Sequence, residues 1–118
     1  MKIYTSYFDV IQKIPDYIIP ISICGKAPDS YKGLQYKKLA PKLKFFLEWK
    51  QNKNNDFYIE HFNKEVLEKL SKENVLKDLE NLSGGKDIVL ICYEKPNEFC
   101  HRHLVAEWLD CNIEEYII

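Results

Sequence analysis

A short stretch near the end of the chain holds most of its chemically reactive side chains. The segment ICYEKPNEFCHRHLVAEWL, residues 91–109, contains two of the four cysteines, two of the three histidines and the only arginine. In an enzyme, a thiolate at Cys100 would be the nucleophile, His101 its base or acid, and Glu94 a further acid–base group. Arg102 would hold a phosphate or a carboxylate through its forked guanidinium. These residue types indicate covalent chemistry on an anionic substrate.

The elements expected around this segment place it at the functional edge of a sheet. Residues 87–94, DIVLICYE, form an apolar run typical of a parallel strand that is covered on both faces. A turn follows, and a helix is predicted to begin near Cys100. Ligands of open parallel sheets bind where the strands end and the next helices begin. Unpaired amides at a helix start also attract anions and lower the pKa of a thiol.

The same side chains also have a structural interpretation. A helical projection places His101 in the middle of an apolar arc, with Cys100 and Arg102 on its flanks. His103 projects to the opposite, solvent side. Cys100 would then be a small buried hydrophobe, and His101 a core histidine bonded to a backbone carbonyl. Arg102 would pair with an acid such as Glu98. The sequence leaves both interpretations open.

The rest of the chain alternates strand and helix patterns, which predicts one α/β domain over residues 1–118. Strands are expected at residues 2–8, 17–24, 87–94 and 113–118, and helices beginning near Pro41, Ile59 and Ser71. This order fits a small three-layer fold with a short, mostly parallel sheet of about four strands flanked by helices. Pro20 cannot donate to a strand ladder, so residues 17–24 are expected at an edge of the sheet.

One segment of the chain is distinctly basic. Residues 32–53 carry seven lysines against one acid, Glu48, although the formal net charge of the whole chain is -1. The helix predicted there has four residues at helical spacing, namely Leu43, Phe46, Leu47 and Lys50. The lysines form either a solvated helix face or a docking surface for a nucleotide or a nucleic acid.

Composition narrows the class of protein. Apolar residues make up 46% of the 118 residues and charged residues 30%, which is typical of a soluble globular protein. The N-terminal residues lack a signal-peptide pattern, and no window approaches the roughly 18 uninterrupted apolar residues of a membrane span. A cytoplasmic location without membrane contact is therefore expected. In that compartment, the four cysteines are expected to be free thiols, metal ligands or catalytic groups rather than a disulfide framework.

Three segments resemble a known family. LICYEKPNEFCHRHLVAEWL closely resembles the C-terminal signature of the domain-of-unknown-function 488 family, and YKKLAPKLKFFLEWK and YIEHFNKEVLEKL extend the likeness over nearly the whole chain. In that signature, a strand ending in Cys-x-Glu is followed by Cys-His-Arg and a helix beginning Leu-Val-Ala. The resemblance implies a small α/β domain. It also implies a site formed by Cys92, Glu94, Cys100, His101 and Arg102.

The resemblance also directs attention to the end of the second expected strand. Many relatives carry Asp-Val-Arg at the end of the second strand, where this chain has ISICGKAP, with neither acid nor arginine. Lys26 is therefore the expected second basic group. Ser6 and Tyr7, near the end of the first expected strand, are further candidates for substrate binding, as is Cys92.

Three hypotheses for function follow. The first is an enzyme, without a cofactor, that acts on a nucleotide-like or nucleic-acid-linked anion through Cys100 and His101. The second is a module that binds phosphate or nucleic acid without catalysis, using the helix start and residues 32–53. The third and weakest is a metal centre of Cys92, Cys100, His101 and His103, because the spacing is not C-x-x-C and His103 projects away from His101. No bound metal is expected.

Overall fold

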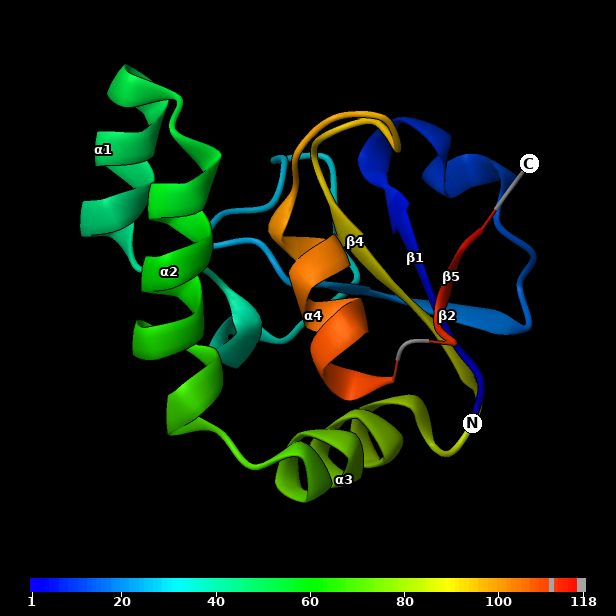
Figure 1. Ribbon diagram of the computed structural model, residues 1–118. Helices are drawn as coiled ribbons and strands as arrows, with labels where there is room; N and C mark the ends of the chain where they lie inside the picture. The colour runs from blue at the N-terminus through cyan, green and yellow to red at the C-terminus, as the bar shows by residue number, and fades with distance from the viewer. Residues whose placement is uncertain (111, 117–118) are drawn as a thin grey trace.

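A single five-stranded sheet organises the molecule in the computed structural model, which describes residues 1–110 and 112–116 (Figure 1). The strands are β1 (Ile3–Tyr7), β2 (Ile18–Ser22), β3 (Leu34–Gln35), β4 (Asp87–Cys92) and β5 (Glu114–Glu115). Their spatial order is β3-β2-β4-β1-β5, and the pairs of neighbouring strands are parallel. The predicted α/β class is confirmed, with one strand more than the expected four because the two-residue β3 joins the edge beside β2.

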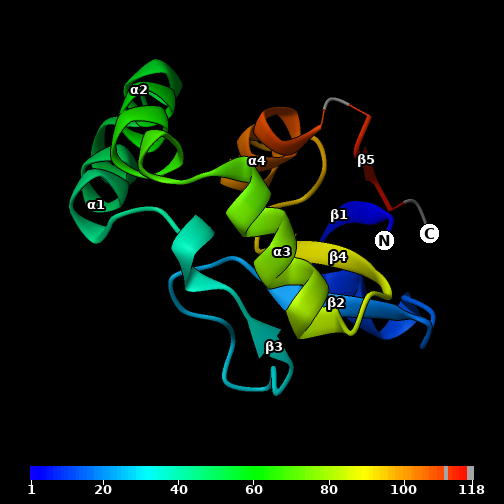
Figure 2. The same ribbon diagram turned by 90° about the horizontal axis from the view of Figure 1, so that it is seen from below.

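The helices gather mainly on one face of this sheet. They are α1 (Leu43–Asn52), α2 (Asn55–Glu65), α3 (Lys72–Ser83) and α4 (His101–Leu109), with short 3-10 segments η1 (Phe8–Lys13), η2 (Lys37–Leu39) and η3 (Leu67–Lys69). Seen from below, α3 and α4 lie over the sheet, while α1 and α2 form a pair at one side of it (Figure 2). Within residues 1–110 and 112–116, no helix is long and apolar enough to cross a membrane.

The alternating side chains of β4 explain why the strand is apolar throughout. Ile88 and Leu90 enter the main core with the helices, whereas Val89 and Ile91 enter a smaller core that includes Ile14. Both faces of β4 are therefore covered, as its continuous apolar run predicts. The cover on the second face is thin, because it comes from η1 and the residues that follow it rather than from a long helix.

The expected edge position of residues 17–24 is wrong, because β2 lies between β3 and β4. The physical reason lies in the shortness of β3, which pairs only with Ile21 and Ser22. The carbonyl of Pro20 accepts a hydrogen bond from the Tyr31 hydroxyl at 3.2 Å instead of joining a ladder. The N and C=O of one strand residue point to the same side of the strand. Proline lacks an N–H, and at Pro20 this N–H would point to the side where β3 does not pair, so no ladder hydrogen bond is lost.

Helix α1 buries a different face from the one its predicted stripe suggests. Phe45 and Trp49 are its core residues, whereas Leu43 and Leu47 are 69% and 51% exposed. Helix α3 follows its predicted signals more closely. Ser71 is its N-cap and accepts a hydrogen bond from the amide of Asn74, and the glycine after Ser83 has a positive φ of 66°. A left-handed residue of this kind ends a helix at low cost when it is glycine.

Strand β4 and helix α4 bring the chemically interesting segment together. The strand ends at Cys92, and the helix begins at His101 with Cys100 in the extended N-cap position. Both elements agree with the predicted boundaries to within about two residues. The expected strand at residues 113–118 is confirmed in part by β5, while Cys111 and residues 117–118 lie outside the described residues.

Candidate functional site

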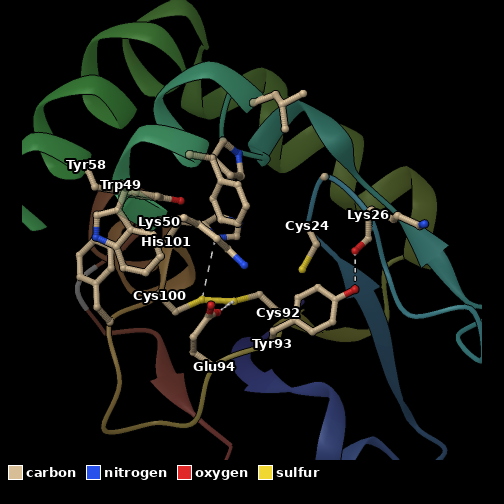
Figure 3. Close-up of a pocket in the computed structure, with 15 residues that line it drawn as sticks. Cys24, Lys26, Trp49, Lys50, Tyr58, Cys92, Tyr93, Glu94, Cys100 and His101 are labelled. Carbon is tan, nitrogen blue, oxygen red and sulfur yellow. Dashed lines mark hydrogen bonds between the residues drawn. A yellow bond between two sulfur atoms is a disulfide. The ribbon is translucent and has the colours of Figure 1, made fainter. Parts of the chain in front are cut away.

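A cavity of about 710 Å³ lies at the carboxyl ends of β2 and β4. The close-up shows α1 on one side of it and the sulfur atoms of Cys92 and Cys100 at its floor (Figure 3). Glu94, His101 and Lys26 are also among its lining residues. The structure therefore brings together five of the eight predicted site residues. The volume falls within the range of small-molecule sites, roughly 300–1,000 Å³.

The two cysteines at the floor are bonded to each other. The Cys92 and Cys100 sulfurs form a disulfide, and the residues are 1% and 3% exposed. Free thiols, metal ligands or catalytic groups were expected rather than disulfides. That expectation is wrong for this pair, because the end of β4 and the cap of α4 place the two side chains against each other. Cys24 is a free, buried cysteine beside them. Burial raises its pKa to about 12, so it stays a protonated thiol near neutral pH.

His101 is held in one tautomer by the backbone of the neighbouring strand end. Its Nε2 lies 2.8 Å from the carbonyl oxygen of Ile23, and because a carbonyl only accepts, Nε2 carries the hydrogen. The lone pair of Nδ1 is then directed toward Cys100 Sγ, 3.9 Å away. The pKa of His101 is lowered to about 4, mainly because the ring is buried, so the ring is neutral at pH 7. The predicted bond to a backbone carbonyl is confirmed, and it leaves Nδ1 available for the acid–base role, which stays a prediction.

Arg102 lies beneath the cavity rather than in its wall. Its side chain is fully buried, and its Nε and Nη2 donate to the two carboxylate oxygens of Glu115 at 3.1 and 2.9 Å. Its Nη1 donates to the carbonyl of Glu94 at 2.7 Å and lies 3.4 Å from Cys92 Sγ. The expected pairing with Glu98 is wrong, since Glu115 is the partner. With the guanidinium fork occupied in this way, the geometry does not favour direct contact of Arg102 with a ligand.

Glu94 and Lys26 line the cavity in different ways. Glu94 is half-buried, and its Oε2 lies 3.5 Å from Cys92 Sγ, so its carboxylate faces the sulfur pair. The side chain of Lys26 is exposed and points away from the sulfurs in Figure 3, while its backbone carbonyl accepts a hydrogen bond from the Tyr93 hydroxyl at 2.5 Å. Lys26 is thus placed at the rim.

Ser6 and Tyr7 are not among the residues that line the cavity. Ser6 pairs with Ile91 in the β1–β4 register and is fully buried, and its hydroxyl has no hydrogen-bond partner among the described residues. It therefore faces the smaller core, on the side of the sheet away from α4. Tyr7 pairs with Cys92, and its ring lies 5.9 Å from the guanidinium carbon of Arg102. Both residues therefore lie outside the cavity.

The aromatic wall of the cavity is the part of the site that sequence reasoning missed. Trp49 packs against Phe99 and Tyr58 at ring-centroid distances of 5.6 and 5.5 Å, and all three line the cavity. Phe46 and Lys50 complete this wall, with the ammonium 5.2 Å from the centroid of the phenyl ring. The available signal was the helical spacing of Phe46 and Lys50, because the stripe predicted for α1 forms part of this wall.

Comparison with known families gives a match. A profile of the DUF488-N3a family, described as the active DUF488-N3 subclade, matches residues 16–112. The chain belongs to the DUF488 family. No curated protein and no solved structure matches the chain significantly. The matched range includes β2, β4 and α4, and it covers all the residues that line the cavity of this DUF488 protein.

Three potential metal ligands also converge in this DUF488 chain. The ligand atoms of Cys92, Cys100 and His101 lie within 4.8 Å of one another. His103, the fourth residue considered from sequence, is not part of this group among the described residues. The projection of His103 into solvent is wrong, because it is only half-exposed and its Nε2 is buried without a partner in the described part of the chain. Burial lowers its pKa.

Proposed function

We propose that this DUF488 protein is a small enzyme in which the Cys100 thiolate attacks an anionic, nucleotide-like or nucleic-acid-linked substrate. The observation that carries the proposal is the unprotonated Nδ1 of His101 facing Cys100 Sγ, with Nε2 fixed on the Ile23 carbonyl. This is the arrangement of a nucleophile, its base, and a third group that orients the base. The active form is the dithiol, which the reducing cytoplasm would maintain.

The protons and electrons of the attack can be followed through named atoms. His101 Nδ1 takes the thiol proton, the Cys100 sulfur forms a bond to the electrophilic atom, and the leaving group departs with its electron pair. The leaving group then takes the proton back from His101. The pKa of about 4 applies with Cys100 in the disulfide. A thiolate beside the ring stabilises the imidazolium and raises that pKa toward the useful range.

The cavity suits a substrate with a planar ring and an acidic group. Trp49, Phe46 and Phe99 supply aromatic surface, which stacks with the face of any nucleobase. Lys50 extends over the sulfur pair from the α1 side, and Lys26 adds a cation at the rim (Figure 3). The description of the family as an active subclade accords with catalysis. Residues 32–53 would extend the contact if the substrate is part of a nucleic acid.

The test compares the alkylation rates of two thiols in one molecule. Fully reduced protein is treated with iodoacetamide over a pH series, and mass spectrometry assigns the labelled sites. Cys100 should react at a pH below the value of about 8.5 expected for a free thiol. Cys24 is the internal control, because its pKa of about 12 keeps it a protonated, unreactive thiol over the pH series. His101→Gln should move the Cys100 profile to higher pH. Equal, slow labelling of Cys100 and Cys24 would sink the proposal.

A metal centre is the second candidate, and the convergence of Cys92, Cys100 and His101 favours it. In the reduced protein, two thiolates and a neutral imidazole form a ligand set that zinc accepts. The bond from His101 Nε2 to a backbone carbonyl is the kind of outer contact that orients a metal-binding imidazole. Such a centre would have a fourth position open to the cavity. It ranks second because the structure bonds the two sulfurs to each other.

A further inference from the structure

We infer that Cys92 is the resolving cysteine of a two-electron thiol–disulfide exchange carried out by Cys100. This further activity rests on the proposed reactivity of Cys100 and adds a second catalytic residue. The substrate it implies is a disulfide, and the enzyme reduces it. The reductant that completes the cycle is a dithiol.

The bond between the two sulfurs is the first observation. Cys92 and Cys100 are bonded in the structure, so the resolving step needs no movement of β4 against α4 beyond the present arrangement. Both residues line the cavity, where a dissolved disulfide can approach them. Cys24 belongs to the same cluster but forms no disulfide, so the exchange is assigned to Cys92 and Cys100 and not to Cys24.

The two sulfurs have different polar neighbours, which assigns them different roles. Cys100 Sγ faces His101 Nδ1 at 3.9 Å. Cys92 Sγ has the carboxylate of Glu94 at 3.5 Å and the guanidinium of Arg102 at 3.4 Å. The carboxylate can accept the Cys92 proton, and the buried cation stabilises the resulting thiolate. Each thiol therefore has its own proton acceptor, as two successive nucleophilic attacks require.

The two steps balance in atoms and electrons. The Cys100 thiolate attacks one sulfur of a disulfide RSSR, forms a mixed disulfide Cys100–S–S–R, and releases RS⁻. The Cys92 thiolate then attacks the Cys100 sulfur, forms the observed bond, and releases the second RS⁻. The protons of the two thiols pass through His101 and Glu94 to the released thiolates. Two electrons move from the protein to the substrate, and a dithiol returns them to the protein.

Oxidised glutathione is the probe, because its carboxylates suit the lysines at the cavity and its disulfide is accessible. Reduced wild-type protein, Cys92→Ser, Cys100→Ser and the control Cys24→Ser are mixed with it and quenched with acid. Intact mass and peptide mapping locate each adduct, and released glutathione is counted. Wild type and Cys24→Ser should release two equivalents and end with the Cys92–Cys100 disulfide. Cys92→Ser should release one equivalent and keep glutathione on Cys100. Cys100→Ser should release almost none.

Two outcomes overturn the inference, and they differ in what else they affect. If wild type keeps glutathione on Cys100 as long as Cys92→Ser does, Cys92 does not resolve the adduct, although Cys100 remains a nucleophile. If neither protein reacts at Cys100, the proposed function fails together with the inference. Cys92→Ala provides a second variant should serine disturb the buried site. Far-ultraviolet circular dichroism confirms that each variant is folded before the comparison.

Discussion

Replacing Glu115 by glutamine should destabilise the protein strongly, because it leaves the Arg102 guanidinium buried without a counter-charge. Arg102 is fully buried and Glu115 is 18% exposed, and two hydrogen bonds of 2.9 and 3.1 Å join them. The Thr5 hydroxyl also donates to Glu115, at 2.6 Å. A glutamine side chain keeps one acceptor oxygen but turns an amide donor toward the cation.

The expected loss follows from breaking a buried ion pair on one side only. Such a change typically costs about 3–5 kcal/mol, most of it from the charge left behind. For a chain of 118 residues, this loss corresponds to a fall in Tm of roughly 12–20 °C. Thermal and urea unfolding of the oxidised protein would measure both quantities. The matched control is Glu114→Gln, an exposed neighbour on the same strand, which should change stability by less than about 0.5 kcal/mol.

Similar stabilities for Glu115→Gln and Glu114→Gln would refute this reasoning. That result would mean that water reaches Arg102 or that the guanidinium finds another acceptor. The conclusion that the geometry does not favour direct contact of Arg102 with a ligand would then fall, and a direct contact with substrate would become the better explanation of its presence.

Two further predictions concern His101 and metal. His101 has a pKa of about 4 in the folded protein, against an ordinary value of 6.5. As the pH falls, the unfolded chain therefore binds a proton at this histidine before the folded protein does. The free energy of unfolding should fall by about 3 kcal/mol between pH 6.5 and 4. Urea unfolding at both pH values should show this component in wild type and in the control His61→Gln but not in His101→Gln; identical pH slopes in all three proteins would disprove it. Elemental analysis of reduced, untagged protein should show well under one equivalent of zinc, whereas stoichiometric zinc that is lost in His101→Gln would favour the metal centre.

The site could be predicted from the sequence where its residues come from elements that are consecutive along the chain. A strand, a turn and a helix that follow one another directly are expected to place Cys92, Glu94, Cys100 and His101 near one another, and the structure brings these four together. The bond of His101 to a backbone carbonyl was also anticipated, but not which carbonyl accepts it, that of Ile23. That contact depends on the pairing of β2 with β4, and the residue pattern of a single segment does not predict which strands pair.

Several of the predictions that were wrong depend on contacts between distant segments. Glu115 reaches Arg102 only because β5 adds to β1, and no local spacing relates the two residues. Helical periodicity identified a stripe on α1 but not what it faces, and Phe46 of this stripe lines the cavity as well as packing against the core. The Cys92–Cys100 bond was missed because the usual state of cytosolic thiols was applied to a pair that the fold holds in contact.

Nitrogen-15 NMR of histidine-labelled protein tests the central claim most directly, since the claim rests on which ring nitrogen of His101 carries the hydrogen. The His101→Gln variant assigns the resonances among the three histidines. In the oxidised protein, His101 should show a protonated Nε2 and an unprotonated Nδ1, and should remain neutral down to about pH 4. Reduction should shift the Nδ1 signal as Cys100 becomes a thiol. A hydrogen on Nδ1, or titration near pH 6.5 in the oxidised protein, would contradict the proposed base and the catalytic role built on it.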